Sequence, residues 1–214
     1  MLLACFFALG HGILFAQAEK ALRVLHTTEK SANHVPPQEA PAGLKKIYSN
    51  LGEVKLNLYN DTDGWGVAGP NSAFFEEFTA MPFTPKTNSH VSQVQVAVAY
   101  LGSGANQVNL SIYADASGTP GTLLAGPVTV TNLPEYGTCC TLAVASFTPL
   151  AVTGGTRYWV VADTPLSGTG SDFVGGWNWV VDPFILVGSN FDGGGWTDID
   201  GNGRPAGEVL GTIP

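Results

Sequence analysis

The stretch Val108–Val130, VNLSIYADASGTPGTLLAGPVTV, decides how this chain folds. Polar and apolar residues alternate from Val108 to Tyr113, which is the two-residue period of a strand with one buried face. The next residues, Ala114–Pro120, include Asp, Ser, Gly and Pro, all of which favour turns. The chain then continues through a second run that is rich in Leu and Val. The pattern predicts a hairpin of two antiparallel strands.

The same alternation of short apolar runs and turn clusters fills most of the 214 residues. Charged residues make up only 12%, against roughly 25% in average proteins, whereas Gly (27) and Pro (14) are frequent. This composition favours an all-β fold, specifically a single-domain, jelly-roll-like antiparallel β-sandwich. Turn clusters are expected at Asn60–Gly64 and at Gly193–Gly203, among other places. The predicted strands are Val54–Tyr59, Phe74–Phe78, Val91–Tyr100, Val108–Tyr113, Leu123–Val130, Thr141–Phe147, Arg157–Asp163, Phe173–Val181, Ile185–Val187 and Gly207–Ile213.

The first 18 residues differ from the rest and are interpreted as a secretory signal peptide. Leu2–Phe15 is almost wholly apolar, and Ala16-Gln17-Ala18 has the small residues of a cleavage site. Two alternatives are a membrane anchor, for which the run is short, and lipidation of Cys5. Residues 19–46 are polar and are predicted to form a flexible leader, so that the sandwich domain occupies residues 47–214. After removal of the signal peptide, we expect that the protein is not an integral membrane protein.

Charge excludes nucleic acid as a partner of the folded domain. From Ile47 onward, four basic residues stand against fourteen acidic ones, a net charge of −10. An acidic surface repels a phosphate backbone. Solubility is the simpler explanation of this acidity.

The order of short motifs along the chain carries a resemblance. IYSNLG (Ile47–Gly52) and AMPFTP (Ala80–Pro85) precede LSIYADASGTPGTLL (Leu110–Leu124), LAVTGGTRYWVVAD (Leu150–Asp163) and a closing PAGEVLGT. The chain resembles the "choice-of-anchor" domain, R type, of bacterial extracellular proteins. The resemblance implies an exported all-β module at the cell surface or in the matrix. It implies no activity and no catalytic residues.

Cys139 and Cys140 are the only cysteines that remain after removal of the signal peptide. In an oxidising compartment, each has only the other as an intramolecular partner. Neighbouring Cα atoms lie about 3.8 Å apart across a trans peptide, which is below the usual disulfide range. A vicinal disulfide, two free thiols and an intermolecular bridge therefore all stay open.

A second candidate site is the acidic segment before the last predicted strand. Asp198, Asp200 and Asn202, followed by Gly203, match the start of a calcium-binding loop. Val209 stands where such a loop needs a bidentate Glu. The alternative is an ordinary hairpin turn, so calcium is the one cofactor that the sequence suggests.

Aromatic side chains form the third candidate site. Trp177 and Trp179 are two residues apart and would share one face of a strand, with Trp196 nearby. If exposed, they would form a platform on which sugar rings stack. Large aromatics also fill protein cores, and Trp159 is expected there.

Enzymatic chemistry has little support in the sequence. His90 is the only histidine from Ile47 onward, and no nucleophile-elbow sequence occurs. Glu76 and Glu77 are adjacent and would face opposite sides of a strand. We therefore expect a non-enzymatic, secreted or cell-surface interaction module that binds a surface or matrix component. The alternatives are a carbohydrate-binding module that uses exposed aromatics and, third, a hydrolase.

Overall fold

The hairpin predicted from Val108–Val130 is formed by strands β7 (Gln107–Asp115) and β8 (Pro120–Thr131). They pair antiparallel, and the core-facing side chains of β7, which include Leu110, are fully buried. The backbone amide of Ala116 donates to the Thr119 carbonyl and closes the turn. The computed structural model describes residues 24–27, 41–52 and 58–214, with only the backbone described at 24, 181–186, 191 and 199–202.

Strands and turns make up these described segments, which contain no helix. The other strands are β1 (Val24–His26), β2 (Lys45–Ser49), β3 (Asn60–Ala68), β4 (Glu77–Phe83), β5 (Ser89–Val96), β6 (Val98–Ser103), β9 (Ala143–Val152), β10 (Tyr158–Asp163), β11 (Val174–Phe191), β12 (Trp196–Pro205) and β13 (Gly207–Thr212).

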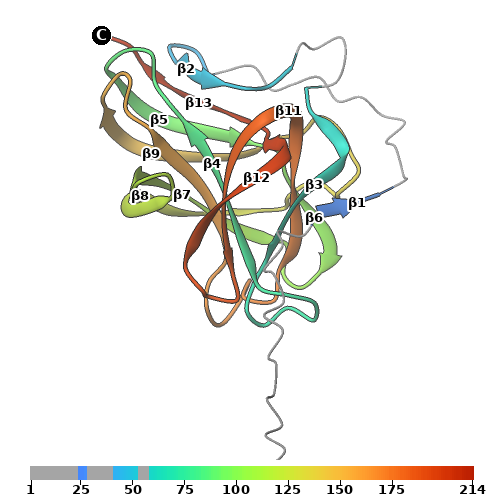
Figure 1. The fold of residues 1–214 in the computed structure, drawn as a ribbon. Coiled ribbons are helices and arrows are strands. Elements are labelled where there is room, and N and C mark those ends of the chain that lie inside the picture. Colours follow the sequence, from blue (N-terminus) through green and yellow to red (C-terminus); the bar gives the residue numbers. More distant parts are fainter. Residues whose placement is uncertain (1–23, 28–40, 53–57) are drawn as a thin grey trace, which may run out of the picture.

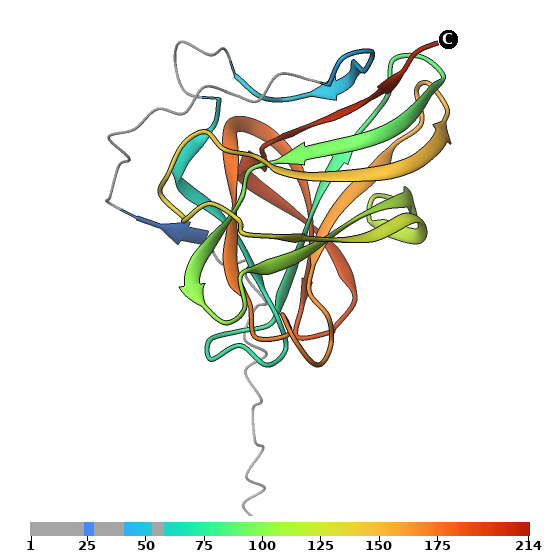
Figure 2. The ribbon, with the colours of Figure 1, turned by 180° about the vertical axis from the view of Figure 1, so that it is seen from behind.

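These strands form two antiparallel sheets that pack together, as Figures 1 and 2 show. The large sheet has the order β1-β3-β11-β4-β10-β7-β8, and β6 and β12 also pair with β11. The small sheet has the order β2-β13-β5-β9. The predicted antiparallel β-sandwich is confirmed. Strands β8 and β9 each end one sheet, and both lie at the same side of the sandwich.

The main core lies between the two sheets. Alternate residues of each strand point inward. Apolar residues at every second position of a strand therefore build this core. From the large sheet come Met81, Phe83, Ile112 and Trp177, and from the small sheet come residues such as Val94. Burial of side chains of this size contributes roughly 1.5–3 kcal/mol each to folding.

Strand β11 is the central element of the large sheet. Its first part, Val174–Trp179, pairs with β3 and β6, and its last part, Gly188–Phe191, pairs with β4. Strand β12 folds back along it from Asn190 to Trp179. The sequence predicted two strands here, separated by a break near Pro183, whereas the structure has one long strand with a register shift between Val181 and Ile185.

Two segments predicted as turns are strands. Asn60–Gly64 belongs to β3, and most of Gly193–Gly203 belongs to β12, whose hairpin turn is short and lies at Asp192–Gly195. Both segments are rich in Asp, Asn and Gly, which disfavour strands intrinsically. They become strands because β11 pairs with both of them.

The expected leader also contains strands. Val24–His26 forms β1 on the edge of β3, and β2 begins at Lys45. The predicted strand Val54–Tyr59 falls mostly outside the described residues, and Tyr59 itself is in a bend. The predicted strand Phe74–Phe78 begins late, at Glu77, where β4 starts. The signal peptide lies outside the described residues.

Candidate functional site

Trp177 and Trp179 do not form an exposed platform, so this prediction is wrong. Trp177 has no exposed surface, belongs to the main core and donates from Nε1 to the Ala206 carbonyl at 2.9 Å. Trp179 is 7% exposed and packs edge-on against Trp65, with ring centroids 4.7 Å apart. Trp177 therefore lies in the core between the sheets, and Trp179 lies in a separate buried cluster with Trp65 and Val187.

Trp196 is partly buried at the start of β12. It packs against a small cluster of Ala80, Trp159 and Val161, separate from the main core. Trp159 is fully buried, as predicted, and its Nε1 donates to an Asp115 carboxylate oxygen at 2.8 Å. The structure thus does not bring the three predicted tryptophans together on one surface.

The predicted calcium segment runs along β12. Asp198 lies opposite Gly188 and is exposed, and Asp200 lies opposite Leu186. The side chains of Asp200 and Asn202 lie outside the described part of the chain. An extended strand advances about 3.3 Å per residue and does not wrap around an ion as a calcium loop does. The described residues contain no cluster of three or more His, Cys, Asp or Glu side chains suited to a metal.

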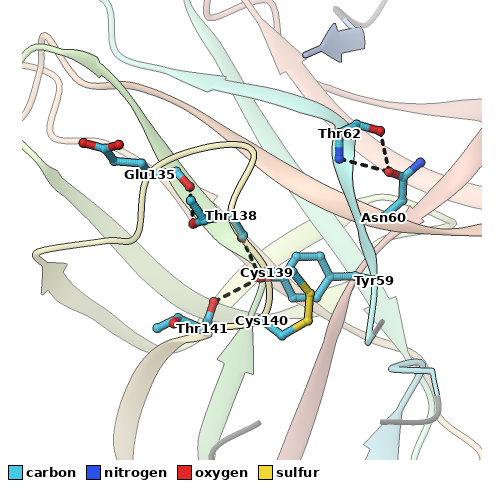
Figure 3. The surroundings of a disulfide bond; sticks show 8 residues. All are labelled: Tyr59, Asn60, Thr62, Glu135, Thr138, Cys139, Cys140 and Thr141. Carbon is cyan, nitrogen blue, oxygen red and sulfur yellow. Dashed lines mark hydrogen bonds between the residues drawn. A yellow bond between two sulfur atoms is a disulfide. The ribbon is translucent and has the colours of Figure 1, made fainter. Parts of the chain in front are cut away.

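Cys139 and Cys140 lie in the loop before β9, and their sulfur atoms contact each other (Figure 3). Both side chains are buried. The Tyr59 hydroxyl faces this loop and lies 3.4 Å from the Thr138 carbonyl and 3.2 Å from the Thr141 carbonyl. Burial, assisted by the nearby charge of Asp61, raises the pKa of Tyr59 well above its usual value, so the phenol stays protonated as a donor. Tyr59 therefore holds the loop on both sides of the cysteine pair.

A groove opens where the edges of the two sheets meet, between β8 and β9. It has a volume of about 540 Å³. Its lining residues are all uncharged: Leu124, Ala125, Gly126, Val128, Ser146, Phe147, Thr148, Pro149 and Leu150. The inner side chains of this set also contact the main core. The groove is thus formed by strands at the edge of the sandwich and reaches its core.

A bulge in β8 forms one wall of the groove. Leu110 pairs with Val128 and Ile112 pairs with Ala125, so Gly126 and Pro127 together face the single residue between them on β7. Gly126 has a φ of 99°, and a Cβ there would lie 2.9 Å from the Leu110 carbonyl oxygen. Only glycine fits both constraints. The bulge lets neighbouring residues of β8 line the same groove.

A larger bulge in β9 forms the opposite wall. Val91 pairs with Leu150 and Gln93 pairs with Ser146, so residues 147–149 have only Ser92 opposite them. In a regular strand, consecutive side chains point to opposite faces. Here five consecutive residues, 146–150, line one groove. Bulges of this kind commonly re-aim side chains beside functional sites.

A hydrogen-bonded row of side chains positions one rim of the groove. Gln95 Nε2 donates to Gln93 Oε1 at 2.9 Å, and Gln93 Nε2 donates to Ser146 Oγ at 3.2 Å. Gln95 is fully buried and Gln93 nearly so, whereas Ser146 is exposed. The Ser146 hydroxyl thus accepts from the protein and keeps its own hydrogen for an outside acceptor.

A second polar row crosses the outer surface of the large sheet, away from the groove. Thr129 Oγ1 donates to Asn109 Oδ1 at 2.9 Å, and Asn109 is hydrogen-bonded to the Asp163 carboxylate. Burial raises the pKa of Asp163 to about 6, although the Asn109 hydrogen bond opposes this shift. The sequence did not single out Asp163, because nothing in the chain marks a strand-end Asp as partly buried.

The remaining acid and base candidates stay apart. His90 is exposed on β5. Glu77 is fully buried and accepts from Ser189 Oγ at 3.2 Å, whereas its neighbour Glu76 is partly exposed in the preceding loop. The two adjacent carboxylates therefore lie in different surroundings.

With this geometry established, comparison of the chain with protein-family models, curated proteins and solved structures finds no match. Within the described segments, no helix is long and apolar enough to cross a membrane.

Proposed function

We propose that this chain is an exported, non-enzymatic interaction module that acts at the bacterial cell surface or in the extracellular matrix. The observation that carries the proposal is the β8–β9 groove, which is open to solvent, is bounded by two bulged edge strands and contains no charged side chain. Concave sites with an apolar floor and a few placed polar groups are typical binding sites. The predicted signal peptide and the resemblance to choice-of-anchor modules support the extracellular setting.

The cysteine pair fits this setting. We propose that Cys139 and Cys140 are bridged to each other in the exported protein, because each sulfur has the other as its contact and both are buried. Secreted proteins keep such bonds, since their compartment is oxidising. The bridge would stiffen the loop that Tyr59 holds beside the core.

A binding assay on the cell envelope tests the proposed function. The mature protein, residues 19–214, is labelled and incubated with envelope fractions of the producing bacterium. Ser146→Trp places a bulky ring at the exposed rim of the groove, and we expect it to reduce binding at least tenfold. Ser167→Trp places the same ring in an exposed turn outside the groove and serves as the matched control. Equal binding by both variants, or no binding by the native protein, would contradict the proposal.

A further inference from the structure

We infer that the β8–β9 groove binds a neutral, hydroxyl-rich ligand, namely a segment of an uncharged oligosaccharide. The inference rests on the proposed function and names the ligand class of the same groove. Its volume lies within the roughly 300–1,000 Å³ that small-ligand sites occupy. The groove offers a ligand hydrogen-bonding groups and an aromatic ring, and no charged side chain.

The charge of the site excludes ionic ligands. Neither β8 nor β9 contains a charged residue along its whole length. The domain around the groove is strongly acidic, with a net charge of −10 from Ile47 onward. An anionic polymer would meet repulsion without a local basic partner, and a cationic ligand would find no carboxylate in the groove. A neutral ligand meets neither cost.

Two prolines disfavour an extended peptide as the ligand. A peptide that adds to a sheet edge needs the regular backbone donors and acceptors of that edge. Pro127 lies in the β8 bulge and Pro149 in the β9 bulge, and proline has no N–H to donate. The bulges also break the register of both edges at the groove. Strand addition is thus interrupted on both walls at the point where the groove is.

The groups that remain match the chemistry of a sugar. Ser146 and Thr148 place two exposed hydroxyls on the rim, and the Gln93 side chain fixes the first of them. Hydroxyls both donate and accept, as sugar hydroxyls do. Between them, Phe147 is half-buried against the core and lines the groove. An apolar ring between two hydroxyls can contact the C–H face of a pyranose while the rim binds its hydroxyls.

Calorimetric titration with neutral oligosaccharides tests the inference. The probes are cellohexaose, xylohexaose and maltohexaose, with an oligogalacturonide of similar length as the anionic comparison. We expect at least one neutral probe to bind and the anionic probe not to bind. Thr148→Val keeps the shape of the side chain and removes its hydroxyl, and should weaken binding roughly 3–10-fold, the usual worth of one such hydrogen bond. Thr156→Val, at an exposed turn outside the groove, should leave binding unchanged.

Phe147→Ala should abolish binding, but it also removes apolar core contacts, so Ser146→Ala provides a second rim variant, which removes only a hydroxyl. A panel of peptides displayed on phage provides the competing ligand class. The inference is overturned if no neutral oligosaccharide binds. It is also overturned if neither Thr148→Val nor Ser146→Ala weakens oligosaccharide binding. If Ser146→Trp still blocks envelope binding in that case, the proposed function stands with another ligand class, such as a selected peptide. If no neutral oligosaccharide binds and Ser146→Trp does not reduce envelope binding, both the inference and the proposed function are overturned.

Discussion

The surroundings of the Asp163 carboxyl group disfavour its charged form. Burial raises its pKa from the ordinary value of 3.8 to about 6. Between these two values the folded state binds more protons than the unfolded chain. Stability should therefore fall as pH rises from about 4 to about 6 and level off above that. The shift corresponds to at most about 3 kcal/mol.

We therefore expect Asp163→Asn to stabilise the protein by about 1–3 kcal/mol at pH 7.5 and to have little effect at pH 4. The amide keeps the shape of the side chain and removes the buried charge. Urea unfolding at both pH values measures the difference. Asp192→Asn, in the exposed β11–β12 turn, is the matched control and should be neutral. A gain that is equal at both pH values would show that the charge of Asp163 is not its source.

The vicinal cysteines give a second prediction at the same scale. If Cys139 and Cys140 are bridged, the non-reduced protein should be lighter than the reduced protein by two hydrogens and should run as a monomer on a non-reducing gel. Because both side chains are buried, iodoacetamide should label them only after unfolding and reduction. Labelling after unfolding without reductant would indicate free thiols. A reducible dimer would indicate an intermolecular bridge.

At the scale of elements, period-two patterning predicted the strands that bury a face against the core. β7, β8, β10 and β13 lie close to their predicted positions because their own residues carry the signal. β3 and β12 could not be predicted in this way. Their Asp, Asn and Gly residues favour turns locally, and only pairing with β11 makes them strands. β11 is distant in sequence from β3, whereas it forms a hairpin with β12.

The candidate site was missed for a related reason. Sequence spacing placed Trp177 and Trp179 on one strand but could not show that other side chains pack over both rings and bury them. The groove depends on where β8 and β9 meet and on two bulges that exist only relative to β7 and β5. The glycine–proline pair at 126–127 is the one local signal that could have indicated a break in β8.

Strand β1 gives a prediction at this scale. It pairs with β3 through three residues, and the His26 imidazole and the Asp63 carboxylate approach to 2.7 Å. The Tyr136 hydroxyl donates to the Leu25 carbonyl at 3.1 Å. Of the two β1 side chains that the structure describes, Leu25 and His26, neither belongs to a buried core cluster. β1 should therefore be an addition to the folded sandwich rather than a requirement for it.

Deleting residues 19–27 from the mature chain should leave a cooperative unfolding transition, with the melting temperature lowered by about 2–8 °C. That corresponds to a loss of roughly 1–2 kcal/mol at this size. Hydrogen exchange should become faster at the amides of residues 63–65 of β3, which pair with β1, and stay slow in the first part of β11. Loss of cooperative unfolding, or equal acceleration in both strands, would show that β1 is integral to the core.

At the scale of the whole molecule, the predicted site of signal-peptide cleavage lies close to the first strand of the folded domain. Cleavage after Ala18 leaves five residues ahead of β1, which begins at Val24. The mature chain would then keep the strand that covers the edge of β3 and the contact between His26 and Asp63. An uncovered edge strand invites pairing with other chains. Cleavage a few residues further along would remove that cover.

We expect protein expressed with its native leader in a bacterium, and recovered outside the cytoplasm, to begin at Glu19, because Ala16 and Ala18 are the small residues that signal peptidase requires. Intact mass and N-terminal sequencing measure this directly. Ala18→Arg should block cleavage and leave the precursor with the cells, whereas Gln17→Ser, between the two small residues, should be processed normally. Extracellular protein that still carries Met1 would contradict the signal-peptide interpretation. An N-terminus beyond Val24 would instead show that β1 is not part of the exported protein, and the edge of β3 would then be free to pair with another chain.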